Sequence, residues 1–364
     1  MSAHESMRAD TMKAIVIRGT EARLESNRPF PRLKDDCVLI KTEAVALNPT
    51  DWKHVALGLG ADGCLLGCDF SGVVRVVGPA VTKPWKAGDR VCGVAHGGNR
   101  FELEDGAFAE YIMVKGDIQL RIPDNMTFTQ AATLGLGVAT VGQGLYQYAL
   151  KLPLPVESPK QTHEVTNILI YGGSTATGAL GIQFARLSGC KVYTTCSPTN
   201  FEYVKTLGAA EAFDYNDDKS ISRLQEFTKG SGLRLAWDTI GTPFSSEFCM
   251  QAMSKGPGCK YGCVSFPPVP ISRNDVLPTG TLMYSAFGEP FVKKGIEFPA
   301  KPEDYEFTKQ FMVITEELLA AGKLRPHIEL VGKGGLGGVL DGLQRMKNGK
   351  VSGNKLVYVV ADTE

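Results

Sequence analysis

The sequence has neither an excess of charge of one sign nor a long run of hydrophobic residues. Its 39 Lys and Arg residues balance 39 Asp and Glu residues, so no basic surface for nucleic acid or anionic lipid is expected. No apolar stretch reaches the roughly 18 residues that a membrane-spanning helix needs. The first ten residues, MSAHESMRAD, lack the apolar segment of a secretory signal. We therefore expect a soluble, cytoplasmic protein without nucleic acid or membrane partners.

A disulfide framework is not expected either. Nine cysteines occur in 364 residues without a secretory signal, which is typical of reduced thiols. The hydrophobic content of 43% is that of an ordinary globular chain, and the length suits two domains.

Two kinds of local pattern divide the chain. From residue 12 to 114, short β-branched runs are separated by Gly, Asp and Pro, which favours a β-rich domain. Residues 127–150 predict a helix, and the proline-containing segment 152–165 is typical of a domain boundary. From residue 167 to 266, apolar strands alternate with helices, which indicates an α/β fold with a parallel, doubly wound sheet.

The C-terminal part of the chain changes pattern again. We predict a helix over residues 303–321, a Gly-rich loop over 332–338, a second helix and a closing strand, KLVYVVA. The sequence shows no internal repeat and no low-complexity tract.

The most informative local motif is ILIYGGSTATGALGIQ, residues 168–183. An apolar strand leads into a glycine-rich turn and then into an Ala- and Leu-rich helix, which is the context that dinucleotide binding requires. Gly172 permits the tight turn, Gly178 lets the helix approach the strand, and the helix N–H groups can meet a pyrophosphate. Because Thr175 replaces the usual middle glycine, an ordinary structural turn remains an alternative for this motif alone.

The end of the next strand distinguishes NAD from NADP. NAD enzymes usually carry Asp or Glu there, which accepts from the ribose 2′-hydroxyl. Residues 194–200 read TTCSPTN without a carboxylate, and Ser197 and Asn200 can donate to phosphate oxygens or cap the following helix. We therefore predict NADPH as the cofactor, with Tyr215 either near the adenosine or serving as an ordinary strand-end tyrosine.

Further motifs occur in the order and spacing of one superfamily. They are AVALNPTDWKH (44–54), LLGCDFSGVVRVVG (65–78), KAGDRVCG (86–93), GAFAEYIMV (106–114), AATLGLGVATVGQGL (131–145) and AAGKLRP (320–326). On these motifs the chain resembles the medium-chain dehydrogenase/reductase superfamily over nearly its whole length. The resemblance implies a GroES-like, β-rich catalytic domain split across both termini, at 12–163 and 300–364. It also implies a Rossmann NADP-binding domain over 164–299, with the active site in the cleft between the domains.

The matched positions lack the zinc ligands of that superfamily's alcohol dehydrogenases. Asn48-Pro49-Thr50-Asp51 stands in place of the first catalytic cysteine, and Cys68-Asp69 in place of the His-Glu pair. We therefore predict no metal. Without a Lewis acid, hydride donation to a C=C bond conjugated to a carbonyl is favoured over alcohol oxidation, because hydroxyl or N–H groups can stabilise the enolate.

The resemblance is closer to one zinc-free subgroup. YGGSTAT (171–177), RLSGC (186–190), TCSPTNF (195–201), GAAEAFDY (208–215), the LPLP of the linker and SAFGE (285–289) look like the trans-acting enoyl reductases of fungal polyketide and polyketide–nonribosomal peptide synthases. This implies reduction of an α,β-unsaturated acyl thioester on the acyl carrier domain of a partner synthase, in secondary-metabolite biosynthesis. Two alternatives stay open, a stand-alone NADPH-dependent quinone or enone reductase and a cofactor-binding scaffold without turnover.

The resemblance also implies roles for single residues. Lys53 would orient the cofactor ribose or stabilise the enolate, and otherwise is a solvated loop lysine. Thr140 would bond the carboxamide or the substrate carbonyl, and otherwise bonds the preceding helical turn. His54 is interpreted as an exposed loop histidine rather than a proton donor, so no general acid is assigned and water is the expected proton source.

The remaining expected contacts fall into two sets. The cofactor contacts are Thr50, Asp51, Trp52, Lys53, Gly172, Ser174, Thr175, Ala176, Thr177, Ser197, Pro198, Thr199, Asn200, Tyr215, Val264, Ser265, Val351 and Ser352. The substrate contacts are Thr140, Val141, Gly142, Gln143, Gly144, Leu145, Tyr146, Gln147, Tyr284, Ser285, Ala286, Phe287 and Gly288, with Phe287 as an apolar wall.

Oligomeric state is inferred from the segment where the edge of the predicted sheet lies. Many relatives in this superfamily dimerise by extending that sheet edge. Here Pro267, Pro268, Pro270 and Pro278 crowd it. Because proline has no N–H to donate to a neighbouring strand, we expect a monomer.

Overall fold

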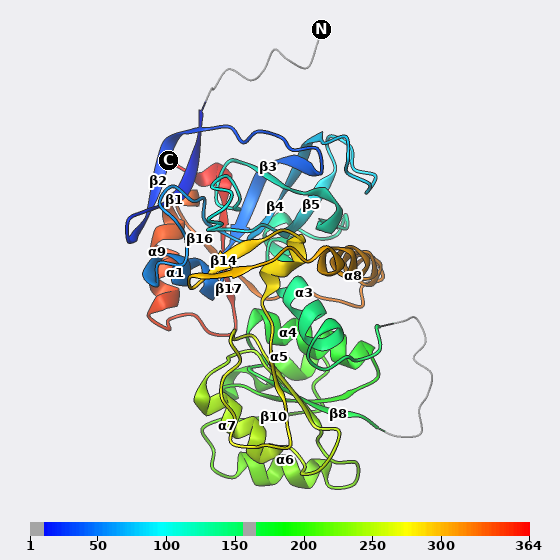
Figure 1. Cartoon of the computed structure of the whole chain (residues 1–364). Helices are drawn as coiled ribbons and strands as arrows, with labels where there is room; N and C mark the ends of the chain where they lie inside the picture. The colour runs from blue at the N-terminus through cyan, green and yellow to red at the C-terminus, as the bar shows by residue number, and fades with distance from the viewer. Residues whose placement is uncertain (1–10, 156–164) are drawn as a thin grey trace.

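A computed structural model describes residues 11–155 and 165–364. Figure 1 shows two lobes. The upper lobe holds a seven-stranded sheet and the lower lobe a six-stranded one. The predicted boundary at 163/164 and most of the predicted linker 152–165 lie outside the described residues. The predicted boundary at 299/300 stays a prediction.

The upper sheet combines strands from both ends of the chain, which confirms the predicted split, β-rich lobe. β17 pairs antiparallel with β3, and Tyr358 lies opposite Val45. In order across the sheet the strands are β16 (Glu329–Gly332), β17 (Lys355–Val359), β3 (Cys37–Ala46), β4 (Asp69–Val77), β5 (Arg90–Val94) and β7 (Leu120–Arg121); β6 (Tyr111–Lys115) also pairs with β3, and β1 (Thr11–Arg18) and β2 (Glu21–Pro29) form a separate hairpin.

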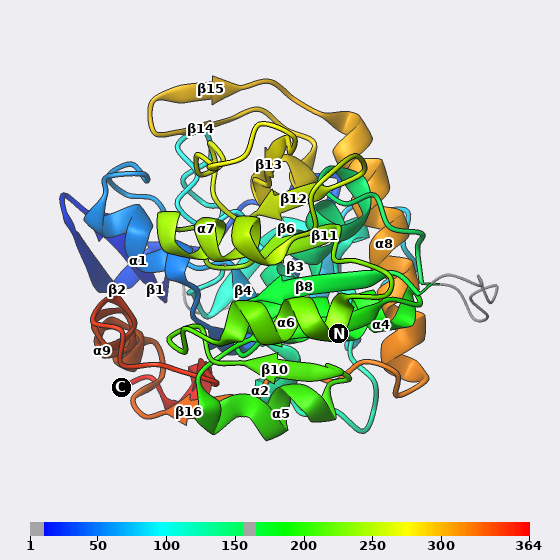
Figure 2. The ribbon, with the colours of Figure 1, turned by 90° about the horizontal axis from the view of Figure 1, so that it is seen from below.

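The lower sheet is parallel throughout, which confirms the doubly wound Rossmann fold. Alternate residues of its central strand face opposite layers: Ile168 and Ile170 pack with α4, whereas Leu169 packs with α6 and α7. Figure 2 shows these helices against the sheet. In order the strands are β10 (Glu211–Phe213), β9 (Lys191–Thr195), β8 (Asn167–Tyr171), β11 (Leu235–Asp238), β12 (Lys260–Cys263) and β13 (Pro278–Gly280), and the helices are α4 (Ala176–Leu187), α5 (Phe201–Thr206), α6 (Ser220–Thr228) and α7 (Pro243–Ala252).

The single helix predicted over 127–150 is instead three pieces: α2 (Phe128–Ala131), α3 (Gly135–Val141) and a π-helical segment over Gly142–Gln147. The glycines of this region weaken a continuous helix. Two of them also serve close packing, since a Cβ at Gly144 would lie 2.4 Å from the Trp237 indole nitrogen and one at Gly142 would lie 2.8 Å from the Phe311 ring.

The predicted Gly-rich loop over 332–338 is also partly helical, because α9 (Gly335–Lys347) begins inside it. Buried Leu336, Val339 and Leu343 join the core of the upper lobe, and this burial outweighs the low helix propensity of the glycines. The predicted helix over 303–321 is confirmed as α8 (Pro302–Ala320). Short 3₁₀ turns cover Gly116–Ile118, Pro198–Asn200 and Val360–Asp362.

The segment after β12 contains further regular structure. β13, which carries Pro278, adds a sixth strand at the sheet edge. A 3₁₀ turn, η4 (Met283–Phe287), and a hairpin of β14 (Phe291–Lys293) and β15 (Ile296–Phe298) follow it. This hairpin crosses the waist between the two lobes in Figure 1, near α1 (Pro49–Ala56).

Candidate active site

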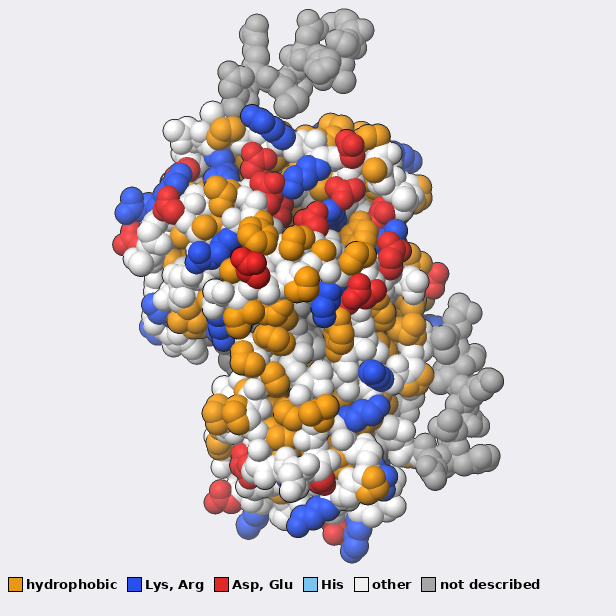
Figure 3. Space-filling model, viewed as in Figure 1, with side chains coloured by type: hydrophobic (Ala, Val, Ile, Leu, Met, Phe, Trp, Pro, Cys, Tyr) orange, Lys and Arg blue, Asp and Glu red, His pale blue; other side chains and the backbone are white. Residues whose placement is uncertain are grey.

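A cleft with a volume of about 760 Å³ lies between the two lobes. It is lined by α1, the first turn of α4, the chain after β9 and β12, η4, the β14–β15 hairpin and the loop after α9. Hydrophobic side chains gather around the waist in Figure 3. Among the lining residues, Phe244 is 60% exposed and Ile296 is 50% exposed. Apolar walls with a few placed polar groups are typical of a small-molecule site.

The glycine-rich turn forms one wall of this cleft. Gly172 has φ +81°, the left-handed conformation that favours glycine. A Cβ at Gly178 would lie 2.2 Å from the carbonyl oxygen of Gly172, so the start of α4 touches the turn directly. Thr175 caps this helix, because its hydroxyl accepts from the Gly178 N–H at 2.9 Å. The substituted middle position is therefore compatible with the turn, and the N–H groups of the first helical residues remain without intrahelical partners.

The end of β9 forms the adjoining wall. Ser197 and Tyr215 both line the cleft, and their hydroxyl oxygens lie 3.2 Å apart. A Cβ at Gly353 would lie 2.4 Å from Oδ1 of Asn200, so the loop after α9 passes close to this end of the sheet. No carboxylate occurs between residues 194 and 200.

The cleft lining includes most of the predicted cofactor contacts and two of the predicted substrate contacts. From the first set it holds Thr50, Lys53, Gly172, Ser174, Thr175, Ala176, Thr177, Ser197, Tyr215, Val264, Ser265, Val351 and Ser352, and from the second Thr140 and Tyr284.

Two of these residues were expected to take part in the chemistry. Burial and the neighbouring charge of Lys294 lower the pKa of Lys53. The Thr140 hydroxyl donates to the Leu136 carbonyl at 2.7 Å, as a helix-interior threonine does. Its oxygen therefore has only acceptor capacity left for a ligand.

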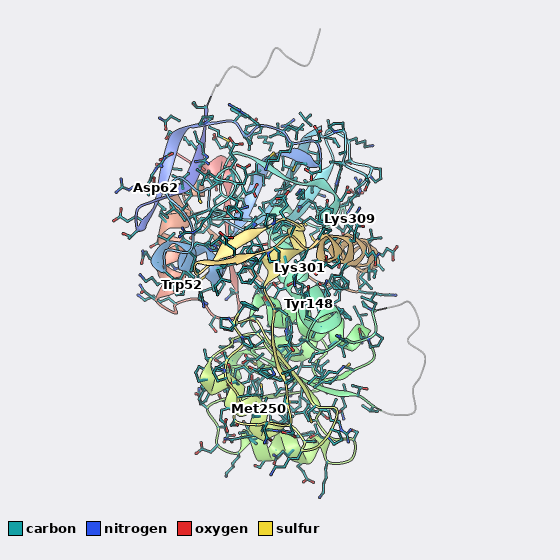
Figure 4. The ribbon with its side chains drawn as sticks, viewed as in Figure 1. Trp52, Asp62, Tyr148, Met250, Lys301 and Lys309 are labelled. Carbon is teal, nitrogen blue, oxygen red and sulfur yellow. The ribbon has the colours of Figure 1, made fainter. Side chains whose placement is uncertain are left out.

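Other predicted contacts lie outside the lining. Asp51 is 1% exposed and accepts from the Asn48 N–H at 2.6 Å. Trp52, labelled in Figure 4, lies on α1 and packs against the core of the upper lobe. The 3₁₀ residues Pro198, Thr199 and Asn200 are likewise absent from the lining. The roles assigned to these residues stay predictions.

Apart from Thr140 and Tyr284, which line the cleft, the two predicted substrate segments meet in the interior. Gln143 Nε2 donates to Ser285 Oγ at 3.0 Å, and both side chains are buried. Phe287 stacks on the His96 ring, with the ring centres 5.2 Å apart, and its role as an apolar wall stays a prediction. The members outside the lining are Val141, Gly142, Gln143, Gly144, Leu145, Tyr146, Gln147, Ser285, Ala286, Phe287 and Gly288.

A contact beside the π-helical segment joins two parts of the chain that are distant in sequence. Tyr148 donates to Asp304 Oδ1 at 2.5 Å, and Lys301 Nζ lies 3.3 Å from the same phenol oxygen. Figure 4 shows Tyr148 and Lys301 at the waist. This contact joins the segment after α3 to the start of α8.

A polar cluster that the sequence did not reveal lies under the β14–β15 hairpin. His54 is 1% exposed, not an exposed loop histidine as predicted. Its Nδ1 lies 2.7 Å from the Thr50 carbonyl oxygen, and its Nε2 is hydrogen-bonded to Lys293 Nζ. Thr50 Oγ1 and the Tyr284 phenol oxygen lie 2.6 Å apart. His54, Tyr284 and Lys293 all line the cleft.

A second buried network joins both ends of the chain behind the site. Lys355 and Asp69, 3% and 0% exposed, form an ion pair. Asp69 also accepts from Asn48 Nδ2 at 2.8 Å and from the Leu136 N–H at 2.5 Å. Over residues 11–155 and 165–364, no three His, Cys, Asp or Glu side chains gather as a metal site would require.

Comparison with known proteins defines the class first. Residues 34–124 match the alcohol dehydrogenase GroES-like domain family, and residues 176–287 match the family described as zinc-binding dehydrogenase. An alcohol dehydrogenase superfamily protein from Novosphingobium aromaticivorans shares the fold, with a TM-score of 0.74, 22% identity, and coverage of 96% of this chain and 100% of that one. The JamJ enoyl reductase also shares the fold, with a TM-score of 0.71, 17% identity, and coverage of 96% of this chain and 99% of that one. The fold and cleft are those of a medium-chain dehydrogenase/reductase.

The particular family follows from closer relatives. The trans-enoyl reductase resD of Aspergillus sclerotiorum is 45% identical over 96% of this chain and 100% of its own length. The trans-enoyl reductase TOXD of Cochliobolus carbonum is 50% identical over 82% of this chain and 98% of its own length. The trans-enoyl reductase ACTTS2 of Alternaria alternata is 43% identical over 96% of this chain and 99% of its own length. The chain belongs to the trans-enoyl reductase family and is an oxidoreductase.

The part of the chain that the structure describes has no helix long and apolar enough to cross a membrane.

Proposed function

We propose that this enoyl reductase uses NADPH to reduce the C=C bond of an α,β-unsaturated polyketide acyl thioester on the acyl carrier domain of a partner synthase. The observation that carries the proposal is the combination of the glycine-rich turn at Gly172 with apolar walls in a single cleft. One wall suits a dinucleotide, and the other suits an acyl chain.

The residues present fit NADPH. The first turn of α4 offers N–H groups for a pyrophosphate, and Gly172 and Gly178 let the turn and this helix lie in direct contact. Ser197 and Tyr215 offer hydroxyl groups where an NAD enzyme would carry a carboxylate, which supports the 2′-phosphate of NADP. When bound, this cofactor supplies a hydride to the β-carbon of the enoyl group.

Lys53 and Thr140 are proposed to orient the nicotinamide half of the cofactor. Because the Thr140 hydrogen is used by Leu136, its oxygen suits the carboxamide N–H group better than a substrate carbonyl. Lys53 supplies a cation at the cleft wall, which suits ribose hydroxyls or a developing enolate.

The acyl chain is proposed to lie against the hydrophobic residues of the waist. Leu282, Met283 and Phe298 join Phe266 and Phe244 in the lining, from η4, the hairpin and the lower lobe. This wall supports an extended apolar substrate more than a compact quinone, which is the alternative.

The decisive experiment is single-turnover oxidation of NADPH by an enoyl pantetheine thioester, beside a simple quinone and beside NADH. Fast oxidation with the thioester and NADPH supports the proposal. Reduction of the quinone alone would instead identify a stand-alone quinone reductase. Tight NADPH binding without turnover, even after the carrier domain is added, would identify a scaffold.

The partner, assembly and location are part of the same proposal. We propose a polyketide synthase or a polyketide synthase–nonribosomal peptide synthetase as the partner in secondary metabolism, and a cytoplasmic monomer as the working form. Pro278 in the edge strand β13 supports the monomer, and nine buried, unpaired cysteines support a reducing compartment. A dimer mass in light scattering would overturn the monomer.

A further inference from the structure

The polar cluster under the β14–β15 hairpin fixes the protonation of His54. The Thr50 carbonyl oxygen, 2.7 Å from Nδ1, can only accept, so Nδ1 must carry the hydrogen. Burial and the nearby Lys293 charge lower the pKa of His54 to about 3, so the ring is neutral. Nε2 is then an acceptor, and in the contact between the two side chains Lys293 is the donor.

The ammonium group of Lys293 is held on a second side. Its Nζ lies 3.9 Å from the centre of the Tyr284 ring, close enough for a cation–π contact. The Tyr284 hydroxyl is itself held by Thr50 Oγ1 at 2.6 Å. An ammonium has three N–H donors, and His54 takes one of them. Lys293 lines the cleft, and in the described part of the chain its ammonium donates to no acceptor other than His54, which leaves N–H donors for a ligand.

We propose that Lys293 is the general acid that protonates the α-carbon after hydride addition, with His54 and Tyr284 as positioning residues. The inference deepens the proposed function and rests on enoyl thioester reduction in this cleft. It assigns the proton donor for which the sequence indicated no side chain.

The proton step balances with the groups named. The β-carbon receives a hydride from the reduced nicotinamide, and the electron pair of the C=C bond passes into the enolate. One N–H bond of Lys293 then breaks, and one C–H bond forms at the α-carbon. The electron pair of the broken bond stays on nitrogen as a neutral amine, which regains its proton from water when the product leaves.

The surroundings of Lys293 suit an acid that works near neutral pH. Burial lowers the pKa of Lys293 to about 8, and the nearby positive charge of Arg100 acts in the same direction. A donor with a pKa near the working pH is both protonated and able to release its proton. In the described part of the chain no carboxylate pairs with Lys293, and the titratable groups that face it are His54, Cys64, Cys68, His96, Arg100 and Tyr284.

The first test uses the ligand-free protein. Competitive acylation with acetic anhydride, followed by peptide mass spectrometry, should give Lys293 an apparent pKa of about 8, well below the ~10.4 of a lysine in a model peptide. Nitrogen NMR should place the His54 hydrogen on Nδ1. An ordinary pKa for Lys293, or a hydrogen on Nε2, would overturn the assignment whatever the substrate is.

The second test follows the fate of the proton. Wild-type enzyme, NADPH and a 2-methyl-enoyl pantetheine thioester in heavy water should yield one configuration at the deuterated α-carbon. Lys293→Met should slow product formation by about 100-fold and yield both configurations, because water then attacks either face. Lys293→Arg should show the same loss, because a guanidinium keeps its charge but does not release a proton near neutral pH.

Matched measurements separate the possible failures. Lys333→Met is the control for removing a lysine, and NADPH binding with thermal unfolding confirms that each variant is folded. A single configuration at the wild-type rate in Lys293→Met would refute the general-acid role. A wild-type enzyme that leaves the thioester unreduced would count against the proposed function, and the ligand-free titration would still decide on Lys293.

Discussion

The two sides of the cleft are assembled in opposite ways. The dinucleotide side is local, since Gly172, Thr175 and Gly178 lie within seven consecutive residues and interact with one another. The opposite side joins Thr50 and His54 to Tyr284 and Lys293, and His54 and Lys293 are 239 residues apart. Local backbone geometry therefore builds the first side, whereas packing of the hairpin onto α1 builds the second.

The largest expected effect tests the long-range side. Lys355→Met leaves the fully buried Asp69 carboxylate without its cation, so the free energy of unfolding should fall by about 3–5 kcal/mol in urea denaturation. Lys309 lies on α8, where Figure 4 labels it, and forms a partly exposed ion pair with Asp117. Lys309→Met removes this pair and should lower the free energy of unfolding by less than about 1 kcal/mol. Equal losses in the two variants would contradict this ranking.

The next effect tests the local side. A Cβ at Gly178 would lie 2.2 Å from the Gly172 oxygen, so Gly178→Ala should push α4 away from the turn. We expect a loss of about 1–3 kcal/mol in stability and at least tenfold weaker NADPH binding in a fluorescence titration. Gly230→Ala is the control, because a Cβ there meets nothing within 4 Å. Unchanged NADPH affinity in Gly178→Ala would argue that the turn does not hold the cofactor.

A smaller effect concerns the choice of cofactor. Ser197→Asp places a carboxylate where NAD enzymes carry one, which repels a 2′-phosphate and accepts from a 2′-hydroxyl. The ratio of kcat/KM for NADPH to that for NADH should fall about tenfold, or roughly 1.4 kcal/mol. Ser222→Asp, exposed on α6, should leave the ratio as it was. If Ser197→Asp did the same, the 2′-phosphate would have to be recognised elsewhere.

The last effect is a pH dependence on the long-range side. Burial raises the pKa of Asp51 from 3.8 to about 7, so between about pH 4 and 7 the folded protein holds this proton more tightly than the unfolded chain. Its contribution to stability is full below pH 4 and is lost as the pH rises through 7. Asp51→Asn should therefore gain up to about 4 kcal/mol relative to wild type between pH 4 and pH 8, measured by urea denaturation, because a pKa difference of 1 corresponds to about 1.4 kcal/mol. A constant difference between the two proteins would contradict the raised pKa.

Which features could be predicted from the sequence depended on how far apart the interacting residues lie along the chain. The strand-turn-helix at Gly172 could be predicted because its constraints act within one turn of chain. The second helix of the C-terminal part was predicted, but the start of α9 inside the predicted loop was not, since its glycines indicate a loop until burial of Leu336 is counted. The role of Lys293 could not be predicted from the sequence, because a lysine in a short hairpin is ordinarily solvated. In the folded protein Lys293 is buried beside His54 of α1.

The sequence by itself determined the α/β class, the glycine turn and the absence of a carboxylate after β9, because each of these depends on backbone freedom, side-chain charge and periodicity along neighbouring residues. Only the tertiary structure decided which groups share the cleft. It buried His54, paired Lys355 with Asp69, withdrew Gln143 and Ser285 into the interior, and placed Lys293 at the cleft wall. The physical reason is that burial and pairing are properties of distant segments brought together, and the pKa of a lysine or a histidine follows its surroundings rather than its neighbours in the chain.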